Sequence, residues 1–338
     1  MERSGELPTK IDRTMDLYFK FLLGHPNRVN LLIDLLNAIF VSLGYPAVRA
    51  ITLVNTEMAP DAAGLRKSIL DISAVDDTGR QINIELQRAK HEYLIPRFFL
   101  YQSRRFNRQL TSGSGFGSLR PTLTAALLNF NMFKDAEDAD CGVWDFVWTN
   151  PARGKILSRM QALFLVEMRK LQKGMRELRH KLRKDPDYQL TAAERLSVWG
   201  AYISNDETGV EMVQDVLVKD KVFHEVNSAE QEYWDIPDYR YYQFLEQVEE
   251  NSLREERDNL IKKAAAKAAA KAAAKAAAKA AAEGRAEGRA EGRAEGLSQG
   301  LIQGQLDTVR QLLASGLLTS EQIAQALNMT VEAVEALK

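Results

Sequence analysis

Hydrophobic and polar residues alternate along two neighbouring stretches of this chain, residues 67–75 and 81–87. An alternation of period two is typical of a β-strand with one buried face. The two stretches are separated by Asp76-Asp77-Thr78-Gly79, and these residue types favour turns. The pattern therefore predicts a β-hairpin whose loop is centred on Thr78.

Two acidic residues face each other in this hairpin. Residues opposite each other across a strand pair share one side of the sheet, and the register centred on Thr78 sets Asp71 opposite Glu85. Like charges in that position repel, so one interpretation is a bound cation, and carboxylate oxygens suit Mg²⁺ or Mn²⁺. The other interpretation is a solvated polar face from which both acids point into water. Lys67 and Gln87 fall on the same side of the hairpin.

The flanking segments predict an α/β domain, because stretches with a helical period and short apolar runs follow one another along the chain. We expect helices at residues 14–23, after Asn27 and at 93–110, and strands at 48–58, 122–130 and 161–167.

The helix expected at residues 93–110 presents a basic and aromatic face. Spacings of four, three and four residues place four side chains on that face: Arg97, Tyr101, Arg104 and Arg108. Arginines suit a phosphate backbone and an aromatic ring suits a stacked base, so this face is a candidate DNA-binding surface. The alternative is a solvated face, with Leu94, Phe98 and Phe99 forming the buried side of the helix.

The hairpin and its surroundings resemble a known family, the Rpn recombination-promoting nucleases and putative transposases of the PD-(D/E)XK superfamily. The segments L-D-I-S and I-E-L-Q are similar to the D…E-x-Q form of that superfamily's signature. The resemblance covers about residues 12–170. The segments that match the family's neighbouring helices and strand are, in order, D-L-Y-F-K-F-L-L-G at residues 16–24, L-L-N-A-I-F at 35–40, R-F-F-L-Y-Q-S-R-R-F-N-R-Q-L at 97–110 and L-R-P-T-L-T-A-A-L-L-N-F at 119–130.

The resemblance implies a restriction-endonuclease-like α/β core, a mixed sheet flanked by helices. It also implies a metal-dependent DNA endonuclease that hydrolyses phosphodiester bonds in recombination or mobile elements, with Mg²⁺ or Mn²⁺ as cofactor. Asp71 and Glu85 would bind the metal and Gln87 stands where most of the superfamily has lysine, so we expect Lys67 to supply positive charge from the neighbouring strand. The alternative is a non-catalytic DNA-binding or assembly protein that retains the nuclease fold.

Composition limits the remaining possibilities. The 338 residues are 45% hydrophobic, which is enough for a sizeable core, and the net charge is −1, so nucleic-acid binding depends on local basic patches. The single cysteine, Cys141, excludes an internal disulfide and favours a reducing, cytoplasmic compartment. The polar N-terminus does not resemble a signal peptide, and no apolar run reaches the roughly 18 residues of a membrane helix, so we expect no membrane partner.

Composition also divides the chain into four segments. We expect a nuclease-like domain at residues 10–170, a helical region at 171–250, a low-complexity tail at 251–305 and a small helical module at 306–338. The A-A-A-K repeats of the tail predict a long helix with a lysine stripe. The E-G-R-A repeats that follow, if helical, would carry an acidic stripe opposite an arginine stripe, although each glycine costs roughly 1 kcal/mol against alanine. Two interpretations stay open: the stripes pair with a partner helix in a homo-oligomer, or the repeats are a spacer. In the module, Thr319 and Gln322 form a predicted capping box, and the final helix is too acidic to read DNA.

Overall fold

The computed structural model describes residues 9–54, 57–58, 68–69 and 71–338. The chain divides into two compact units, one up to Glu250 and one from Asn251 to Lys338, and each is described by itself. Among the described residues, no helix is both long and apolar enough to cross a membrane.

A six-stranded mixed sheet forms the centre of the first unit, with the strand order β1-β4-β5-β6-β8-β7. β5, β6 and β8 run parallel to one another, and the outer strands β4, β1 and β7 join antiparallel. A short antiparallel pair, β2 (Glu57–Met58) and β3 (Ser68–Ile69), lies outside this sheet. The strands of the main sheet are β1 (Ile51–Leu53), β4 (Ile72–Asp76), β5 (Gln81–Gln87), β6 (Thr122–Leu128), β7 (Val143–Asn150) and β8 (Lys155–Glu167).

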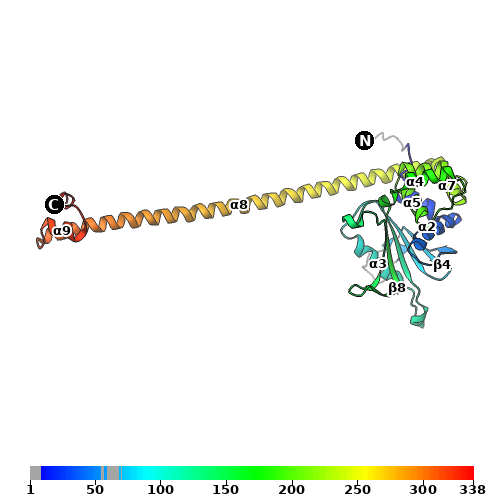
Figure 1. The fold of residues 1–338 in the computed structure, drawn as a ribbon, viewed down its shortest axis with the longest axis horizontal. Coiled ribbons are helices and arrows are strands. Elements are labelled where there is room, and N and C mark those ends of the chain that lie inside the picture. Colours follow the sequence, from blue (N-terminus) through cyan, green and yellow to red (C-terminus); the bar gives the residue numbers. More distant parts are fainter. Residues whose placement is uncertain (1–8, 55–56, 59–67, 70) are drawn as a thin grey trace. The chain divides into compact units, whose positions relative to one another are not determined.

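Helices cover both faces of the sheet, with α3 on one side and α2 and α5 on the other (Figure 1). Their bounds are α1 (Asp16–Leu23), α2 (Val29–Ser42), α3 (Leu94–Asn107), α4 (Met175–Lys184), α5 (Ala192–Ile203), α6 (Glu207–Glu211), α7 (Lys221–Asp235) and α8 (Pro237–Ser315). Short 3-10 helices lie at Pro26–Arg28, Phe116–Ser118, Ala136–Asp138 and Met168–Gln172, and a π-helical turn at Met212–Val216.

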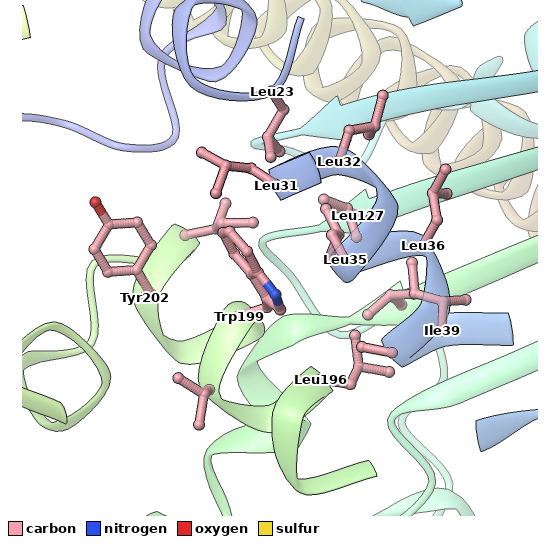
Figure 2. Close-up of a cluster of buried hydrophobic side chains, with 14 of the residues drawn as sticks. Leu23, Leu31, Leu32, Leu35, Leu36, Ile39, Leu127, Leu196, Trp199 and Tyr202 are labelled. Carbon is pink, nitrogen blue, oxygen red and sulfur yellow. The ribbon is translucent and has the colours of Figure 1, made fainter. Parts of the chain in front are cut away.

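The main core lies between the sheet and α2. Leucines recur on α2 at helical spacing, and they pack with Trp199 of α5 over the buried side of the sheet (Figure 2). Trp199 donates its indole N–H to Asp34 of α2 at 2.7 Å, and Asp34 also receives Arg195 Nε at 2.6 Å, so the polar groups at this contact are paired. α5 and α7 therefore belong to the same core as the sheet.

The central hairpin has the predicted register, because Ile72 lies opposite Ile84 and Ser73 opposite Asn83. The predicted length of its first strand is wrong. β4 begins at Ile72 and not near residue 67, and Ser68–Ile69 pair with β2 instead. Asp71 explains the break, since its Oδ2 accepts the Leu86 N–H at 2.7 Å in place of a backbone carbonyl.

Other expected elements need correction. The strand expected at residues 48–58 is reduced in this sheet to β1, and Asn27 lies within a 3-10 turn and does not cap α2. Phe99 is 55% exposed and does not join the core; the buried side of α3 continues from Phe98 to polar residues. The structure also contains β7, which the sequence analysis did not predict. Hydrophobic and polar residues alternate only weakly in β7 because it is a largely exposed edge strand. The strand expected at 161–167 begins earlier, at Lys155.

The second unit begins within α8, which continues without interruption through both repeat types to Ser315. Gly316, at a φ of +66°, ends α8. The predicted capping box of Thr319 and Gln322 is present and starts α9 (Ser320–Leu327), which is followed by α10 (Val331–Glu335). A small core joins these helices to the end of α8 and consists of Val309, Ile323, Ala324 and Val334.

Replacing Leu35 with alanine should lower the free energy of unfolding of the first unit by about 2–5 kcal/mol, because the side chain is fully buried in the α2 core. Leu245→Ala is the matched control. It carries the same change in helix propensity at a position that is 42% exposed, and should cost less than about 1 kcal/mol. Urea unfolding measures both. Equal losses for the two variants would contradict the assignment of Leu35 to the core.

Candidate active site

A row of polar side chains on β4 and β5 faces α3, on the side of the sheet away from the main core. These side chains are buried, with exposed fractions of 1% for Ser73, 0% for Asn83, 2% for Glu85 and 8% for Gln87. Farther along the same face, β6 and β8 present apolar residues that pack on Leu94 of α3. The solvated polar face considered from the sequence is therefore wrong for Glu85, whereas Asp71 is half-buried.

This face of the sheet has a polar half and an apolar half, and the buried side of α3 has matching polar and apolar parts. Leu94 and Phe98 pack on the apolar half of the face. Gln102 donates to the backbone carbonyls of Thr122 and Ala162 at 3.0 and 2.8 Å. Arg105 donates to the Ser73 hydroxyl and to the Ala74 carbonyl, so both polar residues fix α3 to strand backbones.

Asp71 and Glu85 lie together at one end of this polar row. Continuing the β4–β5 register by one residue from Ile72 sets Asp71 opposite Glu85. Burial raises the pKa of Asp71 to about 6, against the hydrogen bond that its carboxylate accepts from Leu86. Burial, and next the charge of Asp71, raise the pKa of Glu85 to about 8. Both shifts have the direction expected when two carboxylates share a dry site.

Gln87 connects Glu85 to the helix above it. Its Oε1 accepts from Arg97 Nη2 at 2.6 Å, and its Nε2 donates to Glu85 Oε2 at 3.4 Å. A glutamine side chain can accept from a guanidinium and donate to a carboxylate at once, whereas a lysine can only donate. Arg97 also lowers the pKa of both carboxyl groups, so it provides positive charge to this site.

The sequence interpretation overlooked α1 as a neighbour of the carboxylates. Lys20 lowers the pKa of Asp71 and Glu85, and Asp16 raises that of Asp71. Lys20 and Asp16 form an ion pair at 2.8 Å on the same helix. Both belong to the D-L-Y-F-K segment that carries the family resemblance. The sequence therefore marked this helix as part of the family's pattern, but it did not indicate that the helix lies near the carboxylates. Asn83 and Arg105 were also missed, because neither stands in the D…E-x-Q pattern.

The chemistry of the donor set fits a hard divalent cation. Glu85 Oε1 is buried without a hydrogen-bond partner among the described residues, and Asn83 and Thr124 in the neighbouring row also have unpaired polar atoms there. Two carboxylates that destabilise each other's charge, one with a spare oxygen, are suitable ligands for Mg²⁺ or Mn²⁺. The described part of the chain contains no group of three or more His, Cys, Asp or Glu residues that could hold a metal, so phosphate and water would supply further ligands.

The predicted DNA-binding face of α3 begins at this site. Tyr101 is half-buried, and the charges of Glu85 and Asp71 add to the effect of burial in raising its pKa, so it lies near the carboxylates. Arg104 is half-buried and Arg108 is exposed farther along the helix. Lys67 lies outside the described residues.

The mixed sheet with helices on both faces is a restriction-endonuclease-like α/β fold, as expected. The family model described as PD-(D/E)XK nuclease family transposase matches residues 13–268, and the chain belongs to this family. The predicted resemblance is thereby confirmed, and the family indicates a nuclease or transposase-associated function with DNA as the substrate. No curated protein and no solved structure matches the chain significantly.

The raised pKa of Glu85 gives a prediction about pH. Because an ordinary carboxyl pKa is about 4 and that of folded Glu85 is about 8, the folded state binds more protons than the unfolded state between these values. Raising the pH through this window therefore lowers the free energy of unfolding of the metal-free wild type. We expect Glu85→Gln in EDTA to be more stable than wild type at pH 8 and equally stable at about pH 4.

Urea unfolding of both proteins across this pH range provides the measurement. A difference between the two proteins that stays constant with pH would mean that Glu85 carries no ionisation penalty in the folded state.

Proposed function

We propose that this protein is a metal-dependent DNA endonuclease and that the Asp71–Glu85 pair is its catalytic centre. The observation that supports this most is the buried Glu85 carboxyl group, whose Oε1 has no hydrogen-bond partner among the described residues, beside the half-buried Asp71. Such a pair is unfavourable for folding by itself, since burial penalises both charges. A group that is costly to stability and has a spare ligand atom is expected where an ion binds.

In this proposal Asp71 and Glu85 would hold Mg²⁺ or Mn²⁺. When bound, the ion would supply Lewis-acid chemistry, namely polarisation of a phosphate oxygen and a lower pKa for the attacking water. Asp71 is oriented by the Leu86 N–H, so its carboxylate is fixed before the ion arrives. Gln87 orients Glu85 through its amide and is itself held by Arg97.

Positive charge at the site comes from helices in this scheme. The superfamily's usual lysine is absent from position 87, and a lysine there would lose the acceptor that binds Arg97. Arg97 and Lys20 already act on both carboxylates, and we propose that they stabilise charge on the phosphate. Lys67 stays a candidate from the neighbouring segment. Tyr101, Arg104 and Arg108 would contact the DNA beside the site.

The alternative is a non-catalytic DNA-binding or assembly protein with the same fold. The observation that favours it is Gln87, which can orient a neighbour but cannot supply charge. A wild-type protein that binds DNA and leaves it intact with Mg²⁺ and with Mn²⁺ would support this alternative. The single cysteine leads us to propose a cytoplasmic location for either function.

Asp71→Asn should reduce Mg²⁺-dependent nicking of supercoiled plasmid by about 100-fold or more, because metal binding supplies several kcal/mol of charge stabilisation. Asparagine keeps a side-chain oxygen to accept the Leu86 N–H, so the fold should be retained. Asp71→Ala loses both the charge and the acceptor and should be equally inactive but less stable than Asp71→Asn.

Thermal unfolding with and without Mg²⁺ separates metal binding from catalysis. We expect Mg²⁺ to raise the melting temperature of the wild type and not that of Asp71→Asn. Undiminished nicking by a pure, folded Asp71→Asn preparation would exclude this hairpin as the catalytic centre.

The tail supports a second proposal, a homo-oligomer formed through α8. Beyond Asn251 the described side chains of this helix are exposed over both repeats, and several are apolar, including Leu297, Leu301 and Ile302. Glutamates and arginines four residues apart form like-charge stripes that disfavour a lone helix, and a partner with opposite stripes would relieve them. The other candidate role of residues 251–305 is a spacer.

Deleting residues 262–338 should leave the melting temperature of the first unit nearly unchanged, since all the residues of its core precede Asn251. If the tail mediates association, light scattering should show a lower mass for the truncated protein. A second deletion of residues 306–338 alone tests whether the small module or the repeats are responsible. An unchanged mass in both deletions would leave the spacer role.

A further inference from the structure

The β7–β8 hairpin extends past the rest of the sheet as a two-stranded ribbon (Figure 1). β6 ends its pairing with β8 at Gln161, but β8 starts at Lys155 and pairs only with β7 over this extension. The ribbon closes through a turn with Gly154 at a φ of +61°. From Trp148 to Leu157 every residue is exposed, so the ribbon contributes little to either core.

The charge of this ribbon is of one sign. Between Phe146 and Val166 the sequence contains three basic residues and no acidic one: Arg153, Lys155 and Arg159. Arg159 is neutralised at the base of the ribbon by an ion pair with Asp145 at 2.9 Å. Arg153 and Lys155 flank the turn, and within the part of the chain that the structure describes neither forms an ion pair.

The same ribbon exposes large apolar side chains. Trp148 is 60% exposed and Leu157 is 82% exposed, although a folded protein gains by burying such groups. A Trp and two cations without ion pairs on one short ribbon suit nucleic acid, with the ring against sugar or base and the cations against phosphates. A two-stranded ribbon also fits the width of the major groove of a DNA duplex, which is about 12 Å.

We propose that residues 148–158 form a DNA-binding arm that inserts into a groove of the substrate duplex. The inference rests on DNA being the substrate of the proposed nuclease. The partner with complementary charge is a polyanion, whereas a second copy paired edge to edge along β7 would bring two positively charged ribbons together.

The arm contacts DNA at a distance from the cleaved bond. Glu85 aligns through Ala126 with Leu165 of β8, and Lys155 precedes Leu165 by ten residues (165 − 155). Along the strand direction ten residues span at most about 33 Å, near one turn of duplex, and two strand spacings of about 4.8 Å each also separate β5 from β8. The arm therefore adds affinity and sets the position of the duplex, and the reacting phosphate lies against other residues.

The test compares Arg153→Ala/Lys155→Ala with Arg183→Ala/Lys184→Ala, a control that removes the same two charges from the exposed end of α4. Both carry Asp71→Asn so that the DNA is not cut, and a 30-base-pair duplex is titrated at several salt concentrations with Mg²⁺. We expect the arm variant to bind about tenfold more weakly at about 0.15 M salt, with the slope of log affinity against log salt reduced by about 2. The control should stay within about twofold of its parent.

Trp148→Ala should weaken binding without changing the salt slope, because it removes contact area and no charge. If the arm variant binds DNA as tightly as its parent and the wild type nicks plasmid, the proposed role of the arm is contradicted and the nuclease proposal stands. A lower mass for the arm variant in light scattering, with unchanged DNA binding, assigns the ribbon to self-association instead. Absence of DNA binding by the Asp71→Asn parent, with no nicking by the wild type, overturns both proposals.

Discussion

Desolvation of two neighbouring carboxylates, the buried Glu85 and the half-buried Asp71, is the constraint on which the rest of the first unit depends. Asp71 and Glu85 sit beneath α3, where desolvation and their mutual repulsion favour the protonated forms. The structure offsets this with directed polar contacts. The Leu86 N–H fixes Asp71, and the chain from Arg97 through Gln87 reaches Glu85. These contacts orient the two carboxylates for an ion, although their desolvation lowers the stability of the metal-free protein.

α3 makes that arrangement possible because its buried side changes character along its length. In its first two turns Leu94 and Phe98 anchor the helix on β6 and β8, while Arg97 binds Gln87. Its last turns are polar, and Gln102 and Arg105 bind strand carbonyls there. A uniformly apolar helix would leave the polar strand row without partners, and a polar one would lose its anchor. The cost of burial is visible in Arg105, whose pKa desolvation lowers to about 10.

The two units depend on different physics. In the first, residues far apart in sequence meet, as when Trp199 of α5 binds Asp34 of α2. In the second, α8 runs through alanine and glycine repeats with little tertiary contact, so local helix propensity and capping determine it. Local rules therefore predicted the helix of the A-A-A-K repeats and the capping box at Thr319.

The sequence by itself determined the hairpin register, since the period-two alternation and the turn around Thr78 leave one pairing that keeps Ile72 and Ile84 on the same side. It also determined the family, because an ordered set of segments along the chain resembles that family and the family model matches residues 13–268. Tertiary structure alone decided that the polar face of the hairpin is buried, since nothing within residues 67–87 reveals that α3 covers it. It decided as well that Lys20 and Arg97 act on the carboxylates, and that β7 pairs as an edge strand. These outcomes depend on which segments far apart in the sequence pack together. Hydrophobic periodicity cannot predict that, because it indicates only which side of a helix or strand is buried.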